Sequence, residues 1–191
     1  MLESLYITKS KIRQDLLTLF FTNSSKKYYL RELERMLGYS AGSIRRELLK
    51  FQKDELFNTQ RVANLLYYSL NTQHPLFKEL KSIVSKTVGV EGSLKKTLSA
   101  IKKIKIAFVY GSFASKSERA TSDIDLMVIG NPDTSYLNEK IAGLERRLKR
   151  EINPTVYSIK EYKDKKRAKS GFMLELLKNS KIMLIGKEND L

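Results

Sequence analysis

Several residue types are absent or scarce in this sequence of 191 residues, and each absence excludes a class of chemistry. The chain has no cysteine, which excludes disulfide bonds and zinc sites built from thiolates. It has a single histidine, His74, which excludes a histidine-based metal site and a catalytic triad of the serine-protease kind. No apolar run approaches the ~18 residues of a membrane-spanning helix, and we expect no signal peptide from this sequence. We therefore expect a cytoplasmic protein that does not enter a membrane.

Acidic residues are also few relative to basic ones. The sequence holds 36 lysines and arginines against 21 aspartates and glutamates, a net charge of +15, and the excess is spread over both halves of the chain. A field of this sign attracts polyanions such as DNA. The same excess also occurs on lysine-rich surfaces that only maintain solubility. Charge alone leaves both explanations open.

The chemistry of the chain is concentrated in one stretch, 104–130. An apolar run over 104–110 ends in Gly111 and Ser112, a polar loop follows, and Asp123-Ile124-Asp125 opens a second apolar run. Carboxylates at positions i and i+2 of a strand point to the same face of the sheet. Because the glycine turn ends the preceding strand opposite them, this arrangement suits the binding of a divalent metal against a triphosphate.

Each of these residues has a physical role in that arrangement. Gly111 has no side chain, so backbone amides can approach a phosphate group closely. Ser112 adds a hydroxyl and is expected to start a helix whose N-terminus favours an anion. Asp123 and Asp125 supply the hard oxygen ligands that Mg²⁺ prefers, and the phosphates of ATP or another nucleoside triphosphate complete the coordination. Metal held in this way neutralises developing charge and orients attack on phosphorus, so the two aspartates are candidate catalytic residues as well as metal ligands.

The resulting pattern, GS-x10-DxD with a strand on either side, resembles the signature of the polymerase-beta-like nucleotidyltransferase superfamily, in its minimal branch. The resemblance implies a nucleotidyltransferase-like domain over 102–191. The third carboxylate of that superfamily, which activates the attacking hydroxyl, is not found, because the matching strand carries Asn153 at the expected position and an amide cannot act as a general base. Glu151 is close but is expected at the end of the preceding helix. Nucleotide and metal binding are therefore better supported than turnover, and enzymatic activity stays open.

The whole C-terminal region is expected to form an α+β fold, a small mixed sheet with helices on one side. The expected strands are 104–110, 124–129, 153–158 and 181–185, and the expected helices are 112–118, 135–150, 159–168 and 172–178. In the loop of the motif, Lys116 and Arg119 are candidates for contacts with nucleotide phosphates, although both can equally be solvated loop charges.

The N-terminal region, 1–72, resembles a winged helix-turn-helix domain that binds double-stranded DNA. Gly38 is expected to end the second of three helices, and Ser40 is expected to cap the third. The expected helices are 10–21, 29–37 and 41–54, followed by the strands 56–60 and 65–70 of a β-hairpin wing. The alternative is an ordinary three-helix packing unit with a solvated basic face.

The exposed face of the third predicted helix carries the candidate DNA contacts. Arg45 and Arg46 can reach bases or phosphates, and Lys50 can reach a phosphate. Small residues near the start of the helix, Ser43 among them, let it approach the major groove closely. The wing tip adds only Arg61, and leucines stand where such wings often carry basic residues, so the wing is expected to contribute little to phosphate binding or to pack on a partner subunit.

A helical connector, 73–101, joins the two regions and is a candidate dimer surface, which would place two recognition helices of a homodimer on successive major-groove faces. Together the regions predict a DNA-binding transcriptional regulator whose C-terminal domain binds a nucleoside triphosphate and Mg²⁺. The alternative, implied by the minimal branch, is an antitoxin that transfers AMP from ATP to a tyrosine of a partner toxin. A metal-free dimerisation or sensor domain is disfavoured, because adjacent buried acids such as Asp123 and Asp125 are costly without a metal.

Overall fold

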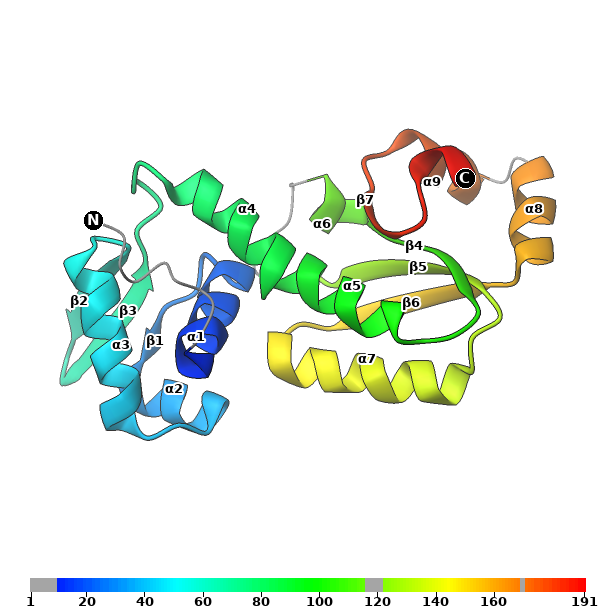
Figure 1. Ribbon diagram of the computed structural model, residues 1–191. Coiled ribbons are helices and arrows are strands. Elements are labelled where there is room, and N and C mark those ends of the chain that lie inside the picture. The colour runs from blue at the N-terminus through cyan, green and yellow to red at the C-terminus, as the bar shows by residue number, and fades with distance from the viewer. Residues whose placement is uncertain (1–9, 116–121, 169–170) are drawn as a thin grey trace. The chain divides into compact units, whose positions relative to one another are not determined.

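The computed structural model describes residues 10–115, 122–168 and 171–191 of the chain. The chain divides into two compact units with the boundary between Val90 and Glu91, and each unit has its own sheet (Figure 1). Each unit also has its own core of buried side chains. None of the helices within the described residues is long and apolar enough to span a bilayer.

The first unit packs helices against a three-stranded antiparallel sheet in the order β1-β3-β2. Its elements are α1 (Lys11–Thr22), β1 (Tyr28–Tyr29), α2 (Leu30–Leu37), α3 (Ala41–Lys53), β2 (Phe57–Val62), β3 (Leu65–Leu70) and α4 (Phe77–Thr87). The three helices and the hairpin predicted from the sequence are confirmed to within two residues at each end.

The reversal between α2 and α3 follows from three residues. Gly38 adopts φ +73°, a left-handed conformation that glycine reaches without steric cost, and its amide donates to the Glu34 carbonyl. The Ser40 hydroxyl accepts from the Ser43 amide, and the Glu34 carboxylate accepts from the Ala41 amide at 3.1 Å. The predicted stop and cap are therefore both confirmed.

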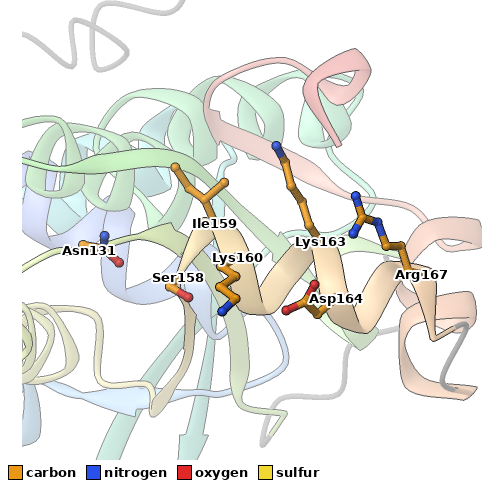
Figure 2. Close-up of a pocket in the computed structure, with 7 residues that line it drawn as sticks. All are labelled: Asn131, Ser158, Ile159, Lys160, Lys163, Asp164 and Arg167. Carbon is orange, nitrogen blue, oxygen red and sulfur yellow. The ribbon is translucent and has the colours of Figure 1, made fainter.

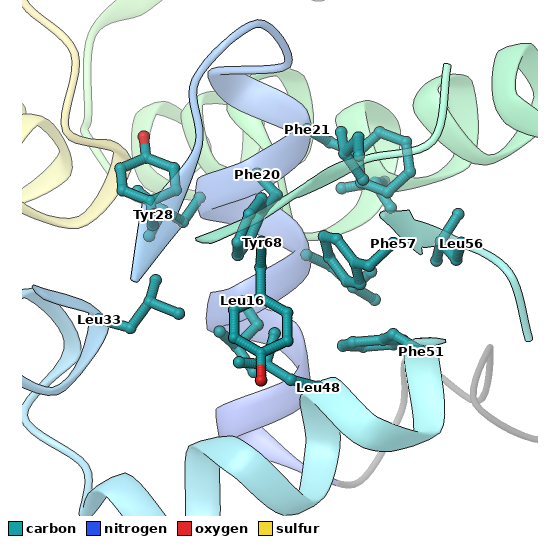
Figure 3. Close-up of a cluster of buried hydrophobic side chains, with 14 of the residues drawn as sticks. Leu16, Phe20, Phe21, Tyr28, Leu33, Leu48, Phe51, Leu56, Phe57 and Tyr68 are labelled. Atoms are coloured by element: carbon teal, nitrogen blue, oxygen red, sulfur yellow. The ribbon is translucent and has the colours of Figure 1, made fainter. Parts of the chain in front are cut away.

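Aromatic rings fill the core of the first unit (Figure 3). Phe20 of α1 is fully buried, and its ring centroid lies 5.1 Å from that of Tyr28 and 4.5 Å from that of Phe57. Phe51 of α3 lies 5.1 Å from the same Phe57 ring, so one cluster joins two helices to two strands. Leu49 of α3 points away from this cluster and is 49% exposed, although the apolar spacing of the helix predicts partial burial.

The second unit is built on a four-stranded mixed sheet in the order β6-β5-β4-β7, in which only the β5–β6 pair is parallel. Its elements are α5 (Val90–Ser99), β4 (Ile104–Tyr110), α6 (Gly111–Ala114), β5 (Ile124–Gly130), α7 (Thr134–Leu148), β6 (Ile152–Tyr157), α8 (Ile159–Arg167), α9 (Gly171–Lys178), β7 (Ile182–Ile185) and a short 3-10 turn (Glu188–Asp190). The predicted α+β class and mixed sheet are confirmed.

Helices cover both faces of this sheet, so the expectation of helices on one side is wrong. On one face, Phe108 and Met127 pack with Tyr162 of α8 and with Met173 of α9. The alternate residues of the same strands point to the opposite face. Val109 there is fully buried, and α5 and α7 lie along that side (Figure 1).

Three helices differ from the predicted bounds by two residues or more. The sequence predicts that Gly89 and Gly92 precede a helix over 93–101, but α5 begins at Val90 and takes Gly92 into its first turn. Helix α7 ends at Leu148, because Lys149 adopts a left-handed conformation with φ +53°. Helix α6 extends only over Gly111–Ala114, and the predicted continuation over 116–118 lies outside the described residues.

Candidate functional site

The turn after β4 is shaped around a glycine. Gly111 adopts φ +73°, and a Cβ atom added to it would lie 2.4 Å from Oδ2 of Asp125. Tyr110, the residue before it, pairs directly with Asp125 across the sheet. Both the backbone conformation and the available space therefore require glycine, and the carboxylate of Asp125 lies against the turn, as the motif predicts.

The two aspartates share one face of the sheet at the start of β5. Asp123 precedes the strand and is exposed, whereas Asp125 lies in it and is half-buried. Burial, and secondarily the negative charge of Asp123, raise the pKa of the Asp125 carboxyl above its usual value. A divalent cation bound here would favour the ionised form of the Asp125 carboxylate, which burial and the charge of Asp123 oppose.

Asn153 occupies the neighbouring position on β6. It pairs in register with Asp125, and its Nδ2 donates to Oδ2 of Asp123 at 3.3 Å. Glu151 is exposed and lies just before β6 rather than in α7, and its carbonyl accepts from the Ile124 amide. Within the described residues no group of three or more carboxylate or imidazole side chains could hold a metal. The third side chain beside the two aspartates is the amide of Asn153.

Three further residues are predicted to contact the nucleotide, namely Ser112, Lys116 and Arg119. Ser112 is half-buried at the second position of α6, a helix of four residues. Lys116 and Arg119 lie outside the described residues.

Arg150 is a site neighbour that the sequence analysis missed. It is 7% exposed, its Nη1 donates to the Ser122 carbonyl at 2.5 Å, and its guanidinium carbon lies 5.9 Å from the centroid of the Phe113 ring. Phe113 follows Gly111-Ser112 and Ser122 precedes Asp123, so one buried arginine contacts both sides of the motif. The sequence predicts Arg150 as the last residue of a helix over 135–150, but that helix ends at Leu148, so Arg150 lies in the loop after it.

An aromatic pair lies on the same face as the aspartates. Tyr110 extends across the sheet, and its hydroxyl lies 3.4 Å from that of Thr155 on β6. The ring of Phe172, at the start of α9, meets the Tyr110 ring edge to face, with centroids 6.0 Å apart. Phe172 nevertheless remains 41% exposed.

A basic cavity lies at the other end of β5. Asn131 follows β5 and Ser158 follows β6, and they border a cavity of about 540 Å³ (Figure 2). Helix α8 lines it with Lys160, Lys163 and Arg167, together with Asp164. It contains none of the residues predicted for nucleotide or metal binding, and it is separated from Asp123 by the length of the strand.

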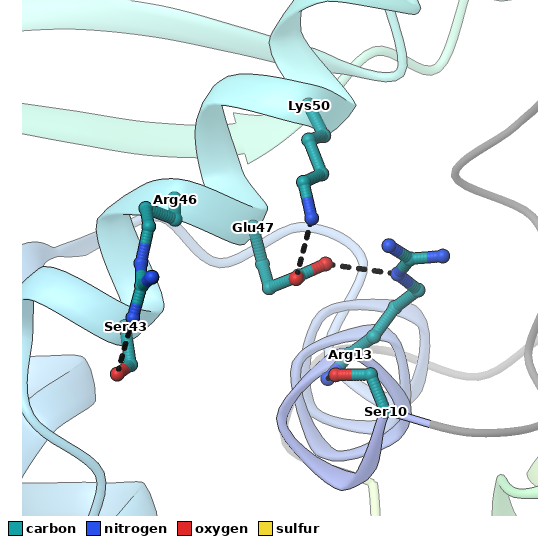
Figure 4. Close-up of polar contacts among 6 residues, drawn as sticks. All are labelled: Ser10, Arg13, Ser43, Arg46, Glu47 and Lys50. Atoms are coloured by element: carbon teal, nitrogen blue, oxygen red, sulfur yellow. Dashed lines mark hydrogen bonds and ion pairs between the residues drawn. The ribbon is translucent and has the colours of Figure 1, made fainter.

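The candidate DNA-contacting side chains of the first unit differ in their exposure and in their hydrogen bonds to neighbouring side chains. Arg45 is exposed on α3, and Arg61 is exposed on β2 near the hairpin turn. Arg46 donates to the Ser43 hydroxyl at 3.3 Å, and Lys50 forms an ion pair of 2.9 Å with Glu47 (Figure 4). All five lie on α3 or on the hairpin, and three of them, Ser43, Arg46 and Lys50, already have side-chain partners.

Glu47 also joins α3 to α1. Its second carboxylate oxygen accepts from Nε of Arg13 at 2.9 Å, so the group receives two cationic donors at once (Figure 4). Burial opposes ionisation of Glu47, but the hydrogen bonds and charges of Lys50 and Arg13 outweigh it, and the pKa of Glu47 is lowered.

Comparison with known proteins assigns the second unit. The family described as polymerase beta, nucleotidyltransferase, matches residues 92–189, just over half of the chain. The chain therefore belongs to this nucleotidyltransferase family.

Two solved structures are similar at low identity. One is a toxin–antitoxin with AMP-PNP, with 20% identity and a TM-score of 0.39, covering 52% of this chain and 76% of that chain. The other is a mutant of the toxin–antitoxin MntA-HpeT, with 20% identity and a TM-score of 0.37, covering 52% of this chain and 75% of that chain. No curated protein matches the chain closely enough for comparison.

Proposed function

We propose that the second unit binds a nucleoside triphosphate with Mg²⁺ and transfers the nucleotidyl group to a hydroxyl of a partner protein. The observation that carries the proposal is the close approach of Gly111 to Asp125 beside Asp123, in a chain of the nucleotidyltransferase family. The paired carboxylates offer the hard oxygen ligands that Mg²⁺ prefers. When bound, this ion would neutralise charge developing on the phosphates.

The residues of the chain itself would position the reactants. The turn at Gly111 brings the backbone against the Asp125 carboxylate, so a triphosphate would meet backbone amides beside the metal ligands. Asp123 and Asp125 would hold the metal. The acceptor oxygen would form a bond with the α-phosphorus as the bond from that phosphorus to pyrophosphate breaks. Asn153 cannot take the proton released from the hydroxyl, so the base would come from the acceptor protein or solvent.

A partner protein is the acceptor that we favour, and the corresponding partner would be a toxin whose tyrosine hydroxyl receives AMP. Because the amide of Asn153 replaces a base, transfer would depend on a group that the acceptor brings. Slow or absent turnover in the isolated chain is therefore consistent with the proposal, whereas binding of the nucleotide is required by it.

The test uses ATP labelled at the α-phosphate, incubated with Mg²⁺ and the pure protein, alone and with the product of the neighbouring gene. We expect label on the partner, and none when Asp123→Ala and Asp125→Ala are combined. Saturable Mg²⁺-dependent ATP binding without label would reduce the function to nucleotide sensing. Absence of both binding and label would overturn the proposal.

A second function is proposed for the first unit, that of a winged helix-turn-helix that binds double-stranded DNA. The supporting observation is the tight α2–α3 reversal through Gly38 and Ser40, followed by the β2–β3 hairpin, with Arg45 exposed on α3. In this arrangement α3 would enter the major groove of an operator as part of a homodimer, and the hairpin would form the wing. The chain would then act as a transcriptional regulator whose second unit responds to nucleotide.

DNA binding is tested by fluorescence anisotropy with labelled duplex DNA from the region upstream of the gene. Replacing Arg45 and Arg46 by alanine should weaken binding by about 1–3 kcal/mol for each arginine that reads a base. An unchanged affinity would remove α3 from the interface.

A further inference from the structure

We infer that Phe172, at the start of α9, forms the surface on which the base of the bound nucleotide stacks. This inference rests on the proposed nucleotide-binding function of the second unit and adds the residue that would bind the base. The motif residues account for phosphate and metal contacts only, and they leave the base without an assigned partner.

The position of Phe172 is set by its contact with Tyr110. The two rings meet edge to face at 76°, and Tyr110 immediately precedes Gly111 and pairs with Asp125. The Tyr110 hydroxyl reaches toward Thr155, so its ring crosses the sheet face beside the aspartates. Phe172 therefore borders the same face as the carboxylates, although it is distant from them in sequence.

Phe172 lies on the exposed side of its helix, as does Leu174, which is 46% exposed. Its neighbour Met173 is 1% exposed and Leu176 is 3% exposed, as the inner face of α9 requires. Phe172 is 41% exposed, and its ring is in edge-to-face contact with the Tyr110 ring on one side. A large apolar ring that is held in place yet open to solvent suits stacking against a planar ligand.

A nucleobase is the planar group that a nucleotidyltransferase would bring to this face. Base–aromatic stacking is sequence-tolerant because every base has a π face. Phe172 would therefore strengthen binding of the nucleoside part without selecting strongly among bases.

The experiment compares two ligands in the full-length protein. MgATP carries the base, whereas Mg-tripolyphosphate carries only the phosphate chain, and calorimetry measures the Kd of each. We expect Phe172→Ala to weaken MgATP binding about tenfold, to leave tripolyphosphate binding unchanged, and Phe172→Trp to retain MgATP affinity. Leu174→Ala, which shortens a residue of the same helix that is 46% exposed, is the matched control and should change neither Kd.

Each other outcome overturns the inference in a recognisable way. If Phe172→Ala leaves both affinities unchanged, the ring does not contact the base, and the proposed function stands. If it weakens both ligands equally, the residue only supports the fold of the site. If the native protein binds neither ligand, the proposed function fails and the inference fails with it.

Discussion

At the residue scale, Asp125 combines a functional placement with an energetic cost. Its raised pKa means that the folded state binds this proton more readily than the unfolded state does. The ionised carboxylate therefore destabilises the metal-free protein when the pH is above the raised pKa, and this penalty disappears as the pH falls below the unfolded pKa. Such a cost is typical of a residue kept for ligand binding rather than for stability.

We predict that Asp125→Asn raises the Tm of the protein in EDTA at pH 7 and abolishes Mg²⁺-dependent ATP binding. The gain in Tm should shrink as the pH is lowered, because the native carboxyl then becomes protonated. Thermal unfolding between pH 7 and pH 4 measures the first effect, and calorimetry measures the second. Asp164→Asn, the same change at an exposed carboxyl on α8, is the control and should leave both nearly unchanged. A lower Tm for Asp125→Asn at pH 7 would contradict this account.

Some residues near the site can be predicted from neighbouring positions in the sequence, and others cannot. Gly111, Asp123 and Asp125 could be predicted because strand geometry and spacing along adjacent segments determine where they point. Asn153 could be predicted because it lies at the start of the adjacent strand β6, opposite Asp125. Arg150 and Phe172 could not, because tertiary packing brings them to the motif from a loop after α7 and from α9.

Arg150 is predicted to couple the stability of the site to its affinity for nucleotide. Arg150→Met removes the hydrogen bond from the guanidinium to the Ser122 carbonyl, and a hydrogen bond to a charged group contributes about 1.5–3 kcal/mol. We expect a lower free energy of unfolding in urea and also weaker MgATP binding, since the arginine that joins both sides of the motif is gone. If stability falls while the Kd for MgATP at a temperature well below unfolding is unchanged, Arg150 is structural only. Arg146→Met, at an exposed arginine of α7, is the control.

At the scale of elements, the orientation of α3 depends on the link through Glu47 to α1. The carboxylate is 12% exposed and receives donors from Arg13 and Lys50. Because the pKa of Glu47 is lowered in the folded state, ionisation contributes stability above its unfolded pKa, and this contribution is lost as the pH falls through the folded pKa.

We predict that Glu47→Gln lowers the free energy of unfolding at pH 7 by roughly 1–2 kcal/mol, the range for a partly exposed hydrogen bond to a charged group. Urea unfolding at pH 7 and at pH 3 measures the difference, which should diminish at the lower pH. Glu32→Gln, at a carboxylate of α2 that no basic group contacts in the described structure, provides the comparison. Equal effects of both substitutions would show that the link does not stabilise α3.

The elements themselves were largely predictable because apolar spacing dominates their formation. The exception at α5 is instructive. Val90, Leu94 and Leu98 are all buried at helical spacing, and their packing outweighs the cost of about 1 kcal/mol for Gly92 within the helix. The strands could also be predicted from the sequence. The face of the sheet that each helix covers could not, because it depends on how the helix packs in the folded structure.

At the scale of the whole molecule, the net charge of +15 can act in two ways that affinity alone does not separate. A general positive field attracts DNA wherever the charges lie, whereas a recognition helix contacts particular phosphates. The sequence could not distinguish them, because it gives the number of charges and not the surface on which a ligand would meet them.

The salt dependence of DNA binding separates the two. Each phosphate that a variant no longer neutralises reduces the slope of log K against log salt by about 0.9, so Arg45→Ala with Arg46→Ala should reduce it by about 1.8 if both arginines bind phosphates. Lys160→Ala with Lys163→Ala removes the same charge from α8 in the second unit and should leave the slope close to the native value. Anisotropy titrations between 50 and 300 mM KCl measure all three proteins. Equal reductions in both variants would assign DNA binding to the overall field, and a reduction confined to the α8 variant would move the nucleic-acid surface to the basic cavity of the second unit.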